Sequence, residues 1–132
     1  MIEIYMDENL SEYVADALNS LNKGYCKDIF VHSAKIKFGK GEPDETIIPA
    51  IGNSGGVMIT RNLNIYKTKL QYQLCKQYQI GIFFIKMPKG MDKHWEITKL
   101  LVNSWEEIIE KVSKEERPFG YEIPIRGKMR KV

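Results

Sequence analysis

The chain has 132 residues, 43% of them hydrophobic and 28% charged, and a formal net charge of +3. This length fits one domain with a buried core, and no apolar run approaches the roughly 18 residues that a membrane span needs. The two cysteines share no metal-binding spacing with each other or with the two histidines, which argues against a zinc site and for free thiols in a cytoplasmic protein.

The first half of the chain predicts two strands and two helices. Residues 2–6 are rich in β-forming side chains, and the acidic stretch after them lacks the basic region of a signal peptide. Apolar residues recur at helical spacing over 10–21, with Asn9 placed as the helix cap. A strand is predicted over 28–34, and after a loop rich in Gly and Lys a helix is predicted over 43–52.

The second half continues the alternation of strands and helices. Residues 57–60 and 80–86 read as buried strands, and residues 66–79 and 94–112 read as helices. Short buried strands that alternate with helices predict right-handed crossovers and a mainly parallel sheet of about four strands. Residues 117–132 contain Pro, Gly and a basic end, which indicates an irregular tail after a domain that spans residues 1–116.

Acidic and basic residues are distributed unevenly along the chain. Residues 1–60 carry 5 Lys/Arg and 9 Asp/Glu, a net charge of −4, whereas residues 61–132 carry 15 and 8, a net charge of +7. The acidic half can supply carboxylates to a cation, and the basic half can meet phosphates. An uneven solvated surface explains the same counts about as well.

Three polar groups follow the expected ends of strands or open the next helix. In an open α/β sheet, ligands bind outside the carboxyl ends of the strands, so these groups are the natural candidates for a site. They are Asp7-Glu8-Asn9, Asp44-Glu45, and the stretch from Thr60 to Asn64.

Each group also has a structural explanation, because the first suits a helix cap, the second a helix N-terminus, and the asparagines of the third a turn. Several carboxylates at one sheet edge nevertheless repel each other unless a cation lies among them, and Mg²⁺ or Mn²⁺ is the usual choice for oxygen ligands. Such a cation can promote phosphodiester hydrolysis. Arg61, Lys67 and Lys69 would then contact the phosphate backbone.

These residues together resemble a known family. The run DENL at 7–10, the pattern GxPDE at 41–45 and the pattern ITRxxxI at 59–65 are similar to the small PIN-like domains of bacterial toxin–antitoxin operons, the VapC-type ribonuclease toxins. The resemblance extends from residue 2 to about residue 112. It implies a three-layer α/β/α PIN-like fold, Mg²⁺- or Mn²⁺-dependent endoribonuclease activity on RNA, a cognate antitoxin, and in many relatives a homodimer.

The family's metal-binding positions carry over residue by residue. Asp7 matches the first metal-binding aspartate, and Asp44 and Glu45 match the central acidic pair. The aspartate of the family's T-R-D or T-K-D motif is replaced here by Asn62, which therefore holds a catalytic and metal-binding position with an amide. The residues expected to support the site are Glu8, Asn9, Thr60 and Asn64.

The amide at position 62 leaves three explanations open. Asn offers one neutral carbonyl oxygen where Asp offers a negative charge, so metal affinity and turnover are expected to fall. The protein is then a naturally weak enzyme that uses its pocket for binding, or an enzyme for which the remaining carboxylates suffice, or an engineered Asp→Asn variant of an active toxin.

A second function class remains beside the nuclease. A non-catalytic RNA- or antitoxin-binding module on the same fold would bind without divalent metal. A phospho-receiver domain also places acids at strand ends, but it requires an aspartate after the third strand, where this chain has Asn62.

Overall fold

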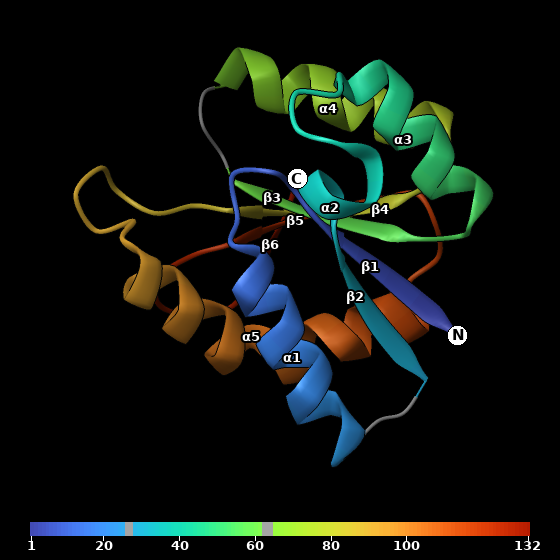
Figure 1. The fold of residues 1–132 in the computed structure, drawn as a ribbon. Coiled ribbons are helices and arrows are strands. Elements are labelled where there is room, and N and C mark those ends of the chain that lie inside the picture. Colours follow the sequence, from blue (N-terminus) through green and yellow to red (C-terminus); the bar gives the residue numbers. More distant parts are fainter. Residues whose placement is uncertain (26–27, 62–64) are drawn as a thin grey trace.

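A computed structural model describes residues 1–25, 28–61 and 65–132. Within these residues, six strands form one sheet with helices on both faces (Figure 1). The strands are β1 (Ile2–Met6), β2 (Ile29–Ser33), β3 (Val57–Arg61), β4 (Gly81–Ile85), β5 (Phe119–Ile123) and β6 (Arg130–Lys131). The helices are α1 (Glu12–Lys23), α2 (Ala34–Phe38), α3 (Asp44–Asn53), α4 (Ile65–Gln77) and α5 (His94–Lys114).

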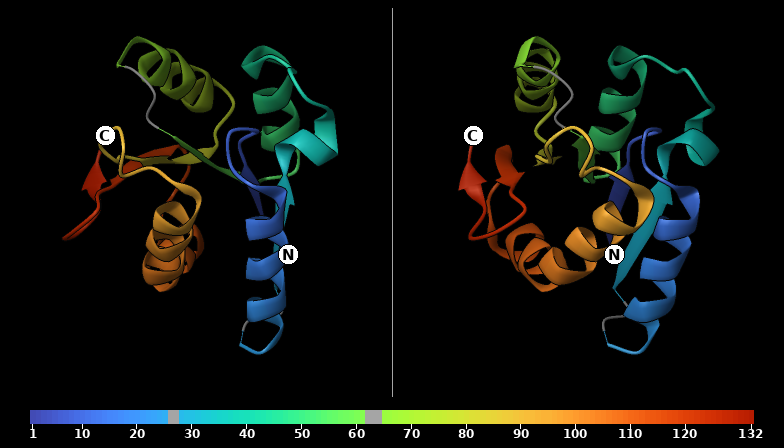
Figure 2. Two further views of the ribbon diagram at one scale, coloured as in Figure 1. Left: turned by 60° about the vertical axis from the view of Figure 1, so that its left-hand side comes forward. Right: turned by 90° about the vertical axis from the view of Figure 1, so that its left-hand side faces the viewer.

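The sheet has the strand order β2-β1-β3-β4-β5-β6. Strands β1 to β5 are parallel to their neighbours, and β6 pairs antiparallel with β5 at the end of the sheet opposite β2 (Figure 2). The predicted mainly parallel α/β architecture is confirmed. The predicted number of about four strands is wrong, because residues 119–123 add a parallel strand and residues 130–131 fold back onto it.

Helices cover both faces of the sheet, which makes the three layers. Helices α1 and α5 pack on one face and α3 and α4 on the other, below and above the sheet in Figure 1. Strand β4 is buried along its whole length because side chains on both of its faces meet a helix layer. None of the described helices combines the length and the apolar character that a bilayer span requires.

Two local expectations differ from the structure. Helix α1 begins after Ser11, whose Oγ accepts a hydrogen bond from Tyr13 N at 3.1 Å, and Asn9 is not its cap. Ser and Asn are comparable N-caps, so the sequence pattern favoured neither strongly. The short helix α2 was not predicted, and it lies directly after β2 in a stretch of only five residues.

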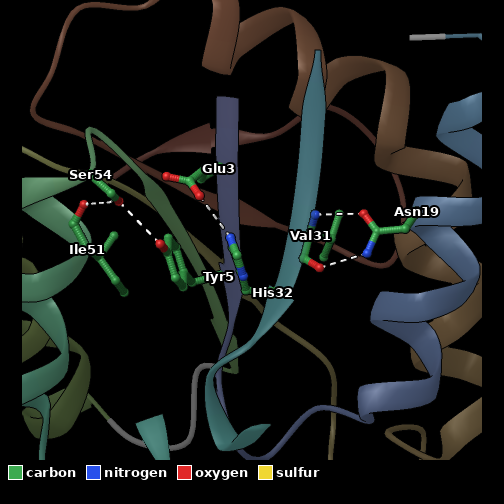
Figure 3. A network of polar contacts seen from close by, with 7 residues as sticks. All are labelled: Glu3, Tyr5, Asn19, Val31, His32, Ile51 and Ser54. Carbon is green, nitrogen blue, oxygen red and sulfur yellow. Dashed lines mark hydrogen bonds and ion pairs between the residues drawn. The ribbon is translucent and has the colours of Figure 1, made fainter. Parts of the chain in front are cut away.

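The outer edge of β2 is closed by a side chain from α1 (Figure 3). The amide of Asn19 donates from Nδ2 to the carbonyl oxygen of Val31 at 2.8 Å and accepts from Val31 N at 2.7 Å. Asn19 thus takes the place of a neighbouring strand at the centre of this edge, which makes the edge a poorer template for pairing with another chain. On the same strand His32 Nε2 lies 3.0 Å from Glu3 Oε1, a contact that gives this histidine a structural role.

Candidate active site at the carboxyl edge of the sheet

The candidate site lies at the point where the strand order reverses. Strands β1 and β3 are neighbours, and the connection after β1 leads to β2 on one side whereas the connection after β3 leads to β4 on the other. Such a switch point opens a crevice at the carboxyl ends of the two inner strands. Here Asp7 follows β1 directly, and Thr60 lies near the end of β3.

Asp7 is buried and held by bonds from both sides of the switch point. Its backbone N–H donates to the carbonyl oxygen of Ile59 at 2.9 Å, and its Oδ2 accepts from Thr60 Oγ1 and from Asn9 Nδ2, each at 3.0 Å. Only 7% of Asp7 is exposed. The side-chain bonds described for Asp7 use one carboxylate oxygen, so they leave Oδ1 for a further ligand.

Asp44 is the first residue of α3. Its Oδ2 accepts from Gln71 Nε2 of α4 at 3.1 Å. Burial raises the pKa of Asp44 above its ordinary value, and the negative charges of Asp7 and Glu45 raise it further, whereas Gln71 and Lys67 oppose the shift. The negative charges of Asp7 and Asp44 therefore act on each other at this edge of the sheet.

Helix α4 supplies a polar face to the site that the sequence analysis did not fully recognise. Lys67, Gln71 and Cys75 are four residues apart and so lie on one side of the helix, toward Asp44. Gln71 was missed, and the signal available in the sequence was its spacing of four residues from both Lys67 and Cys75. Burial raises the pKa of the Cys75 thiol to about 12, which excludes it as a nucleophile near neutral pH.

The fit of a divalent cation depends on the donors that the fold gathers. Among the described residues, no three His, Cys, Asp or Glu side chains form a group that could enclose a metal ion by themselves. Mg²⁺, however, is commonly bound through one or two carboxylates and keeps several waters. Asp7 and Asp44 fit that pattern, since a cation bound beside them would offset both the burial and the like charge of Asp7 that raise the pKa of Asp44.

The remaining predicted ligands have a weaker structural basis. Glu45 follows Asp44 in the first turn of α3 but is exposed. Asn62 and Asn64 lie outside the described residues, so their roles stay predictions. The carboxylate of Glu8 accepts a hydrogen bond from Gly41 N at 2.8 Å, which ties the loop before α3 to the end of β1.

The predicted phosphate-binding residues differ in their surroundings. Arg61 forms an ion pair with Asp92, a residue of the loop before α5 that the sequence analysis did not single out. A cavity of about 410 Å³ opens beside this pair and is also lined by Glu8, Lys35 and His94. Lys67 acts on the charge of Asp44 from the first turns of α4, and Lys69 is exposed. Arg61 would have to exchange Asp92 for a phosphate to contact RNA.

Comparison with known proteins gives the family. A family model described as a PIN-like domain matches residues 2–87, more than half of the chain and all of the elements that carry Asp7, Asp44 and Thr60. The chain therefore belongs to the PIN-like domain family, whose fold is typical of nucleases. No curated protein and no solved structure matched it in the same comparisons.

Proposed function

We propose that this protein is a divalent-metal-dependent endoribonuclease and acts as the toxin of a toxin–antitoxin pair. The observation that carries the nuclease proposal is the pair of carboxylates, Asp7 and Asp44, whose charges act on each other at the carboxyl edge of a PIN-like sheet. The toxin role rests on the ordered set of motifs around these residues, and it implies a cognate antitoxin as the partner.

The roles follow from the contacts. Asp7 and Asp44 would hold Mg²⁺ or Mn²⁺, with Glu45 and Asn62 completing the set of ligands. The bound cation would supply the Lewis acid that phosphodiester hydrolysis needs. Thr60 and Asn9 fix the orientation of Asp7, and Gln71 fixes that of Asp44.

Three cationic side chains are the candidates for contact with the RNA backbone. Lys67, Lys69 and Arg61 would contact the phosphates of the RNA, which would make binding depend on salt. For Arg61 this contact requires release from Asp92.

The amide at position 62 favours a second candidate. With no carboxylate there, a PIN-like domain can retain its pocket for RNA or an antitoxin and lose hydrolysis. This binding module would associate with its partner equally well in EDTA and in Mn²⁺, whereas the nuclease requires the metal for turnover.

Cleavage of RNA separates the two candidates. We expect Asn62→Asp to cleave total RNA in Mg²⁺ or Mn²⁺ but not in EDTA, because the restored carboxylate adds charge to the metal site. The present sequence is expected to cleave more slowly, and Asp7→Asn introduced beside Asn62→Asp should abolish cleavage. The measurement is the rate of loss of full-length RNA on a denaturing gel.

The matched control is Asp16→Asn, which removes the same charge from an exposed position on α1. It should leave the rate unchanged in the Asn62→Asp background. If no variant cleaves RNA in either metal, the nuclease proposal is wrong and the binding module stands. Cleavage that survives Asp7→Asn would place the chemistry elsewhere.

A further inference from the structure

Two loops, one at the end of the PIN-like match and one beyond it, extend the carboxyl edge of the sheet. Strands β4 and β5 run parallel to β1 and β3, so residues 86–93 and residues 124–129 leave the sheet at the edge where Asp7 lies. Figure 1 shows the first of these loops, in yellow, on the left side of the sheet, where β1 and β3 also end. The second loop follows β5 outside the residues that match the family model.

These two loops carry a concentrated positive charge. They contain five Lys/Arg and one acid, Asp92, which forms its ion pair with Arg61. We call the five basic residues the basic edge, and all of them are exposed: Lys86, Lys89, Lys93, Arg126 and Lys128. Lys86 Nζ lies 3.7 Å from Glu122 Oε2, yet 60% of the Lys86 side chain is exposed, so this contact screens its charge only in part.

The basic edge is close enough to the carboxylates to bind the same molecule. From β1 to β5 the sheet crosses three strand spacings, a width of about 14 Å. With a phosphate every 3.4 Å or more along a nucleic acid strand, that width corresponds to roughly two to four phosphates. A strand whose scissile phosphate lies at Asp7 and Asp44 would therefore reach the basic edge within a few nucleotides.

We propose that the basic edge binds the backbone of single-stranded RNA on one side of the scissile phosphate. This inference rests on the proposed function and adds the path of the substrate. Contacts between exposed cations and phosphates position a strand without reading its sequence, so the basic edge would raise affinity for RNA of any sequence. It would also explain why much of the positive charge lies in the second half of the chain.

The test measures RNA binding without cleavage. A fluorescent 12-nucleotide oligouridine is titrated with protein in EDTA at several salt concentrations, for the present sequence and for Arg126→Gln/Lys128→Gln. Each lost phosphate contact lowers the slope of log K against log salt by about 0.7 for a single strand. We expect the double variant to lower that slope by about 1.4 and to bind more weakly at low salt.

The control is Lys23→Gln/Lys114→Gln, which removes the same charge from two exposed lysines. These lie at the ends of α1 and α5, just before β2 and β5 begin, and therefore near the opposite edge of the sheet. The control should keep the full slope. An equal loss of slope in both double variants, or no loss in either, would overturn the proposal. The proposal would also be overturned if Arg126→Gln/Lys128→Gln lost as much affinity for polyglutamate as it loses for RNA.

The binding test can fail separately from the nuclease proposal. If Arg126→Gln/Lys128→Gln lowers the slope and no variant ever cleaves RNA, the basic edge is an RNA-binding surface of a non-catalytic module. If Asn62→Asp cleaves RNA and the slope is unaffected, the nuclease stands and the path over the basic edge is wrong.

Discussion

Thr60 donates a buried hydrogen bond to Asp7, and this contact joins the side chains at the ends of β1 and β3. Thr60 is 1% exposed, and its Oγ1 lies 3.0 Å from Asp7 Oδ2. A buried carboxylate needs hydrogen-bond donors, because it has lost the water that would hydrate it. The same bond that stabilises the fold therefore also orients the candidate metal ligand.

Replacing Thr60 by Val tests that bond, since Val keeps the shape and loses the donor. We expect Thr60→Val to lower the free energy of unfolding by about 1.5–3 kcal/mol, the range for bonds to a charged partner. In an Asp7→Asn background the loss should shrink to about 0.5–1.5 kcal/mol, because the partner is then neutral. Urea denaturation of the original protein, Thr60→Val, Asp7→Asn and the double variant measures the loss of stability in each background. Equal losses in the two backgrounds would attribute the effect of Thr60 to packing.

At the scale of elements, the pairing of β4 with β5 depends on one glycine in each strand, because each leaves space for an aromatic ring. Gly81 of β4 faces Phe119 across the pair of strands, and a Cβ at Gly81 would lie 2.1 Å from the Phe119 ring. On the other face, a Cβ at Gly120 would lie 2.8 Å from the ring of Tyr72. A glycine in a strand normally weakens it, but here each absent side chain is replaced by a ring from a neighbouring element.

Gly81→Ala should therefore destabilise the protein, because the added methyl group displaces Phe119 from the core. Overpacking of this kind typically costs about 1–3 kcal/mol. Gly24→Ala is the matched control: its added Cβ would meet the nearest atom at 3.6 Å, an ordinary contact, and its stability should change little. Guanidinium denaturation gives both values. A Gly81→Ala protein as stable as the original would show that Phe119 does not need this space.

At the scale of the whole molecule, the candidate site ties together parts that lie far apart in the chain. Asp7 follows β1, Asp44 opens α3, and Gln71, which binds Asp44, belongs to α4. A ligand that binds this arrangement and not the unfolded chain stabilises the whole fold by mass action. Metal binding can therefore be measured without any assay of activity.

We expect Mn²⁺ to raise the melting temperature of the present sequence, by the equivalent of about 2.7 kcal/mol at a hundred times its dissociation constant. Asp44→Asn should remove this response. In EDTA the same variant should be at least as stable as the original, because burial disfavours the charged form of Asp44. Asp16→Asn should keep the response, and a metal-induced shift that persists in Asp44→Asn would exclude Asp44 as a ligand.

The sequence by itself determined the alternation of strands and helices, since buried parallel strands and amphipathic helices leave local patterns of apolar residues. It also placed Asp7 and Asp44 at the carboxyl edge, because parallel strands end at one edge whatever their order. The tertiary structure decided what local patterns do not contain. In the sequence, Pro118 and Gly120 suggest a segment without a strand. In the structure, the ring of Tyr72 occupies the space beside Gly120, and this packing accommodates a glycine within β5. Arg61 pairs with Asp92, which lies 31 residues away in the chain, and Asp44 pairs with Gln71, which lies 27 residues away. At such separations the sequence carries no periodic signal that would join the partners.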